Sequence, residues 1–117
     1  MTREQELLDI IRKLEDNDPT FKDHLKASLI ECLGLMLERG EKYNGSGVPL
    51  MEHMFDEGDC TAYHNAKRPM TRMKSAVRHF GEVVPDEDIK DPIVDQLNYD
   101  LGWLCCRARR SNGNQAP

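Results

Sequence analysis

The sequence has no run of 18 apolar residues and no short apolar segment of the kind found at the centre of a signal peptide. Because a membrane-spanning helix needs about 20 consecutive apolar residues, we expect neither membrane insertion nor secretion, and a cytoplasmic location. The chain of 117 residues has the length of one domain. So short a chain leaves much of its surface exposed, and we therefore expect a homo-oligomer.

Zinc-type cysteine spacing is also missing. The four cysteines form no CxxC pair and are accompanied by no His-x₃-His pair; they are Cys32, Cys60, Cys105 and Cys106. This absence argues against a structural zinc site. Cys105 and Cys106 are adjacent in an apolar helical stretch, so both cannot face the same partner. We expect reduced, buried thiols.

Basic residues are not in excess. The formal net charge of −5 argues against general nucleic-acid binding, because affinity for a phosphate backbone comes from clustered lysine and arginine. Basic residues cluster only locally, in residues 67–78 and 107–110. These clusters suit a phosphate-bearing small molecule at least as well as a duplex.

No segment alternates convincingly between apolar and polar residues, so no β-sheet is predicted. Apolar residues recur instead at the spacing of helices. The predicted helices span residues 3–15, 19–40, 61–80 (kinked, interrupted or begun anew at Pro69) and 91–108. We predict an all-α fold, a small four-helix bundle that forms a single domain over residues 1–110, followed by a disordered tail at 111–117.

Two Asp-Pro pairs, Asp18-Pro19 and Asp91-Pro92, predict the N-caps and first turns of the second and last helices. Residues 43–60 contain turn-forming residues and no helical period, which predicts one long, functional loop. The predicted apolar faces comprise Met70, Met73, Val77 and Phe80 in the third helix and Ile93, Val94, Leu97, Leu101, Leu104 and Cys105 in the last.

Carboxylates at helical spacing form two candidate metal-binding groups. Glu38 and Glu41 lie three residues apart, and Asp91 and Asp95 lie four apart. Carboxylate oxygens are the ligands that Mg²⁺ or Mn²⁺ takes. The alternatives are a solvated helix flank for the glutamates and an N-cap role for Asp91.

Asp95 and Asn98, followed by Tyr99, border the apolar face of the last helix. Polar groups beside a core carry a desolvation cost unless they bind something. The functional interpretation is ligand contact. The alternative is that these are boundary residues hydrogen-bonded to neighbouring helices.

Three basic residues, Lys67, Arg68 and Arg72, lie close together on the third helix. Arg68 and Arg72 are four apart and share a face, from which they can grip phosphate oxygens bidentately, with Lys67 near enough to join them. The alternative is a solvated basic face. Together with the carboxylates, these residues supply the parts of a Mg²⁺–polyphosphate site.

The order of these motifs resembles the MazG-like, all-α nucleotide pyrophosphohydrolases, in particular their nucleotide-modification-associated branch in phages and bacteria. The resemblance covers about residues 29–106, and its most specific element is Asp-x₃-Asp-x₂-Asn-Tyr at residues 91–99. It implies an oligomeric helical bundle that holds Mg²⁺ between two acidic helices. It also implies cleavage of nucleoside triphosphates to monophosphate and pyrophosphate.

The resemblance implies a role for each matching residue. Glu38, Glu41, Asp91 and Asp95 would hold the metal, with Glu38, Glu41 and Asp95 catalytic; Lys67, Arg68, Arg72, Asn98 and Tyr99 would bind the substrate. The chain departs from the family pattern in two places. It keeps only Glu38-x-x-Glu41 of the first acidic helix, and Pro92 falls within the second.

Two functions are therefore predicted. The first is a Mg²⁺-dependent nucleoside triphosphate pyrophosphohydrolase that acts on a (deoxy)nucleotide in a bacterial or phage-infected cell. The alternative is a non-catalytic, phage-type accessory protein that sequesters a nucleotide signal or inhibits a host protein by binding it.

Overall fold

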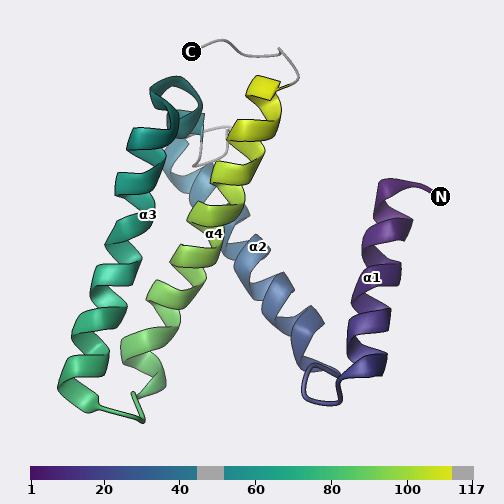
Figure 1. Cartoon of the computed structure of the whole chain (residues 1–117), viewed down its shortest axis with the longest axis horizontal. Coiled ribbons are helices and arrows are strands. Elements are labelled where there is room, and N and C mark those ends of the chain that lie inside the picture. The colour runs from purple at the N-terminus through teal and green to yellow at the C-terminus, as the bar shows by residue number, and fades with distance from the viewer. Residues whose placement is uncertain (45–51, 112–117) are drawn as a thin grey trace. The chain divides into compact units, whose positions relative to one another are not determined.

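A computed structural model describes residues 1–44 and 52–111, with side chains at all of these positions except 40–44, 52–57, 109 and 110. Four helices account for most of these residues (Figure 1): α1 (Arg3–Asn17), α2 (His24–Asn44), α3 (Glu52–Phe80) and α4 (Asp86–Ser111). No strand occurs in the described ranges, which confirms the all-α, four-helix prediction. Over these same residues, no helix has the length and apolar character needed to cross a membrane.

The chain's internal contacts divide it into two compact units, residues 1–34 and residues 35–117, called here the N-terminal and C-terminal units. The boundary falls within α2, after Gly34. The organisation as a single domain over residues 1–110 stays a prediction.

The N-terminal unit contains α1 and the first turns of α2. A capping box begins α1, in which the Thr2 hydroxyl accepts from the Gln5 backbone N–H at 3.2 Å and the Gln5 side chain accepts from the Thr2 N–H at 2.7 Å. Near its end, Glu15 is buried and accepts from the Lys26 ammonium and from the Asp23 N–H, both at 3.0 Å. One carboxylate therefore holds α1 to the start of α2.

The second helix begins later than the Asp18-Pro19 pair predicts. Asp18 does cap a turn, because its Oδ1 accepts from the Thr20 N–H at 2.9 Å. The chain then passes through a left-handed residue, Asp23, at φ 67°, so helical geometry is established only from His24. The predicted N-cap at Asp18 is therefore wrong, and Asp18 ends α1 instead.

In the C-terminal unit, α3 and α4 lie side by side and run in opposite directions (Figure 1). Gly81, at φ 83°, ends α3 in the left-handed conformation that glycine adopts readily. The centre of the unit is a contact between Ala62 of α3 and Cys106 of α4, both 1% exposed. Half-buried side chains pack around this contact; they are Met36, Tyr99 and Trp103.

The buried face of α3 is made of small residues. Ala62, Ala66 and Pro69 are buried at successive four- and three-residue steps. By contrast, Met70, Val77 and Phe80, which were predicted to face the core, are 54%, 50% and 41% exposed. Small side chains let two helix backbones approach closely, which explains why this face is the one that packs. Pro69 lies within α3, so the helix is neither interrupted nor begun anew there, and a kink at Pro69 stays a prediction.

The buried face of α4 also differs from the prediction. It comprises Pro92, Val94, Asp95, Asn98, Gly102 and Cys106. The apolar residues Ile93, Leu97, Leu101 and Leu104, together with Cys105, are exposed. Of the predicted apolar face, only Val94 is buried. Helix α4 therefore packs through small and polar side chains and turns most of its large aliphatic ones outward.

The ends of the last two helices also correct the sequence boundaries. Helix α4 begins at Asp86, so Pro92 lies inside the helix and Asp91 is not its N-cap. Most of the predicted loop at 43–60 is helical, because α2 continues to Asn44 and α3 begins at Glu52, with a non-helical Gly58 inside it. Residues 45–51, and the tail from 112 onward, lie outside the described residues.

The cysteines divide into two classes. Cys32 and Cys106 are buried and Cys60 and Cys105 exposed, so the prediction of buried thiols holds for two of the four. Burial, and then the charge of Glu31, raises the pKa of the Cys32 thiol. At about pH 8, near the ordinary pKa of cysteine, we expect iodoacetamide to modify Cys60 and Cys105 in the native protein.

The two buried thiols should react only in denaturant, which serves as the control. Mass spectrometry of proteolytic peptides measures each site. Native Cys32 reacting as fast as native Cys60 would contradict the assigned burial.

Candidate functional site

The most enclosed acidic group described in the C-terminal unit is Asp95, which is 7% exposed. Both of its oxygens are engaged: Oδ1 accepts from Arg39 Nη1 and Oδ2 from Arg72 Nη2. The two arginines come from α2 and α3, and the carboxylate from α4. A single aspartate therefore joins three helices, and we call these three residues the arginine cluster.

The arginine cluster carries an excess of positive charge, because two guanidinium groups face one carboxylate. The side chains of Arg39 and Arg72 are 29% and 52% exposed, so part of each remains open to solvent. A guanidinium has five N–H donors, and each arginine uses one nitrogen on Asp95. The remaining donors are available to an anion.

Asn98 lies beside the cluster with its amide unsatisfied. It is 6% exposed, and neither its Oδ1 nor its Nδ2 has a hydrogen-bond partner among the described residues. It follows Asp95 by three residues, so the two side chains share a face of α4. Leaving a buried polar group unpaired costs about 1–3 kcal/mol, which favours a ligand that supplies both a donor and an acceptor.

The structure brings together only part of the predicted site. Arg72, Asp95 and Asn98 all lie in the C-terminal unit. Asp95 and Asn98 are buried, and the Arg72 side chain is 52% exposed. None of the other predicted residues whose side chains are described bonds to Asp95: Glu38, Arg68 and Asp91 are exposed, Lys67 lines a groove, and Tyr99 packs against the Ala62–Cys106 contact. The Glu41 side chain lies outside the described residues.

The carboxylates do not assemble a metal site in the described part of the chain. No three His, Cys, Asp or Glu side chains among the described residues are placed to hold one ion. Both oxygens of Asp95 are already bound by guanidinium groups, whose charge repels a divalent cation. The magnesium site stays a prediction.

Sequence reasoning missed Arg39, although a signal was present. Cys32, Met36 and Arg39 follow one another at four and three residues, and so lie on one stripe of α2. Cys32 is buried, and Met36 and Arg39 are half-buried. A charged residue on such a stripe indicates that an opposite charge lies opposite it, since a buried charge must be paired.

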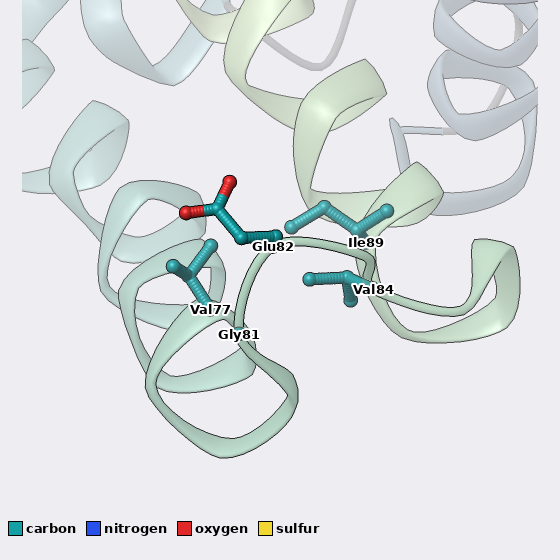
Figure 2. Close-up of a pocket in the computed structure, with 5 residues that line it drawn as sticks. All are labelled: Val77, Gly81, Glu82, Val84 and Ile89. Atoms are coloured by element: carbon teal, nitrogen blue, oxygen red, sulfur yellow. The ribbon is translucent and has the colours of Figure 1, made fainter.

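Described residues of α3, α4 and the turn between them line two hollows. One is a groove of about 370 Å³, lined by Tyr63, Ala66, Lys67, Met70, Gln96, Asp100 and Trp103. The other, of about 500 Å³, lies at the turn between the two helices (Figure 2), where Val77, Gly81, Glu82, Val84 and Ile89 surround it. Hydrocarbon side chains make up most of this second hollow, and Glu82 supplies its one carboxylate, so it lacks convergent polar groups.

No protein-family model matches the chain, and no curated protein or solved structure is significantly similar to it.

Proposed function

We propose that the C-terminal unit binds a phosphate-bearing nucleotide, with its phosphate on the arginine cluster and its sugar or base on Asn98. One observation carries the proposal: a buried carboxylate, Asp95, holds two part-exposed guanidinium groups beside a buried amide that has no partner. Guanidinium groups bind phosphate oxygens in a planar, bidentate geometry.

Asp95 contributes by ordering the arginines before a ligand arrives. A free arginine side chain loses about 2 kcal/mol of rotamer entropy when it is fixed. Because both guanidinium groups are already bound to one carboxylate, much of that loss does not recur on binding. The cluster is thus a preorganised anion site.

A purely structural clamp is the competing interpretation, since the same contacts tie α2, α3 and α4 together. A clamp explains Arg39, Asp95 and Arg72 but leaves the buried amide of Asn98 unexplained. The two interpretations differ in the nucleotide binding that they predict for Asn98→Leu. This near-isosteric change removes an unpaired polar group, so it should keep or raise stability, yet it should weaken nucleotide binding if the amide contacts a ligand.

Calorimetry with a panel of nucleoside triphosphates, first without divalent metal, tests the proposal. We expect saturable binding that Arg72→Met weakens by about 10–100-fold, the effect of losing one charged hydrogen-bonding group. Arg78→Met, an exposed position on the same helix, is the matched control and should bind normally. Circular dichroism confirms folding of each variant. The proposal would be wrong if no nucleotide bound, with or without a divalent metal.

Pyrophosphohydrolysis is the second candidate. Asp95 and Asn98 support it, because both are buried on one face of α4. They also form the Asp-x₂-Asn part of the motif on which the resemblance to the MazG-like family rests. Pyrophosphate release with Mg²⁺ or Mn²⁺ that is lost in Asp91→Asn and Glu38→Gln would establish it, because both residues are exposed and lie outside the arginine cluster. Binding without release would favour sequestration. Homo-oligomerisation and inhibition of a host protein stay predictions.

A further inference from the structure

The groove between α3 and α4 has aromatic and aliphatic walls. Its volume of about 370 Å³ lies in the range of small-molecule sites, which is about 300–1,000 Å³. Trp103 is held firmly there, because its Nε1–H donates to Asp59 Oδ1 at 2.9 Å, while Arg107 Nη1 donates to Asp59 Oδ2 at 2.6 Å. Tyr63 and Met70 supply the α3 side of the groove. A flat apolar ligand therefore finds a fixed indole and a thioether to pack against.

The polar groups of the groove favour a ligand with hydrogen-bond donors. The Gln96 amide is oriented by Asp100, because its Nε2 donates to both carboxylate oxygens at 3.1 Å. That orientation leaves Gln96 Oε1 buried, with no hydrogen-bond partner in the part of the chain that the structure describes. Lys67 also lines the groove, and its positive charge balances the negative charge of Asp100. The lining is therefore close to neutral overall, which disfavours a phosphate.

We propose that this groove is a binding site for an uncharged heteroaromatic ring that carries an exocyclic amino group. The amino group would donate to Gln96 Oε1, which no other group in the described part of the chain satisfies. The Lys67 ammonium would donate to a ring nitrogen. The ring itself would pack between Tyr63 and Trp103.

This site is distinct from the arginine cluster. Lys67 and Arg72 are five positions apart on α3, which places them about 140° apart around the helix. Gln96 and Asp95 are adjacent on α4, and therefore point about 100° apart. A nucleoside without phosphate lacks the group that the arginine cluster would bind. Adenosine held instead at Asn98 would be unaffected by changes at Lys67 or Gln96, so variants of these two groove residues separate the two sites.

Trp103 provides the measurement, because it is the only tryptophan of the chain. Titration of the full-length protein with adenosine should change its fluorescence saturably. Inosine presents a carbonyl where adenosine has the amino group, so it meets the Gln96 carbonyl with a like acceptor. We expect inosine to bind about tenfold more weakly, the cost of one hydrogen bond.

Variants at the groove locate the contact. Gln96→Met should weaken adenosine binding about tenfold and abolish the preference over inosine, because it keeps the side-chain length but removes the acceptor. Lys67→Met should also weaken adenosine binding, whereas Lys74→Met, exposed on the same helix and outside the groove, should not. Far-UV circular dichroism checks that each variant folds.

If Gln96→Met does not fold, the contrast between adenosine and inosine still tests the hydrogen bond, and Lys67→Met with its Lys74→Met control still locates the contact in the groove. Equal affinities for the two nucleosides would overturn the proposal. So would the absence of any saturable signal from Trp103.

Discussion

Replacing Asp95 with alanine should lower the free energy of unfolding by about 2 kcal/mol. The substitution leaves Arg39 and Arg72 near one another with no carboxylate between them. Removing one member of a fully buried ion pair costs about 3–5 kcal/mol. Here the arginine side chains are 29% and 52% exposed, so water re-solvates them in part and the loss is smaller.

Urea unfolding followed by circular dichroism measures the change, and Asp91→Ala is the matched control. Asp91 lies on the same helix but is exposed, so its removal should change stability by less than about 0.5 kcal/mol. A second variant separates a missing charge partner from general damage. Asp95→Leu combined with Arg39→Met and Arg72→Met should recover much of the loss, because apolar replacement of a whole buried charge cluster is often neutral. Equal effects of Asp95→Ala and Asp91→Ala would show that the cluster does not join the helices.

Enlarging Ala62 to leucine should destabilise the protein by about 1–3 kcal/mol. Ala62 is 1% exposed and touches Cys106 where α3 and α4 meet, and Met36, Tyr99 and Trp103 pack around this pair. A leucine there has no space unless the helices separate or neighbouring side chains leave their rotamers. Leucine and alanine differ little in helix propensity, so the effect comes from packing.

The same substitution at an exposed position of the same unit, Ala108→Leu, is the control and should be nearly neutral. Because Trp103 packs against the Ala62–Cys106 contact, its fluorescence spectrum should shift in Ala62→Leu and not in the control. Unchanged stability in Ala62→Leu would mean that α3 and α4 do not approach closely at this point.

The helical content was predictable because apolar residues recur at three and four positions and never convincingly at two. The helix boundaries were less predictable, because an Asp-Pro pair is compatible with several local structures. Asp18-Pro19 forms a turn that precedes a left-handed Asp23, whereas Asp91-Pro92 lies inside α4. The two dipeptides are identical, so the residues around them determine whether an Asp-Pro pair forms a turn or lies inside a helix.

Of the candidate site, Arg72, Asp95 and Asn98 were identified from the sequence, but their arrangement was not. Spacing along one helix identifies which residues share a face, and says nothing of which face is covered. Asp95 is bound by residues 56 and 23 positions away, and those pairings depend on tertiary structure. The same limit explains Lys67, which sits close to Arg72 in sequence yet lines a different part of the surface.

Helix α4 buries small and polar side chains and exposes most of its large aliphatic ones, and this changes how sequence variation in the helix should be interpreted. In most amphipathic helices the aliphatic positions are constrained and the polar ones drift. Here the positions that folding constrains are Asp95, which pairs with two arginines, and the buried Gly102 and Cys106, whose side chains are small. Selection for folding alone would leave Leu97, Leu101 and Leu104 free to become polar. If those leucines nevertheless persist among relatives, folding of the single chain is not what preserves them.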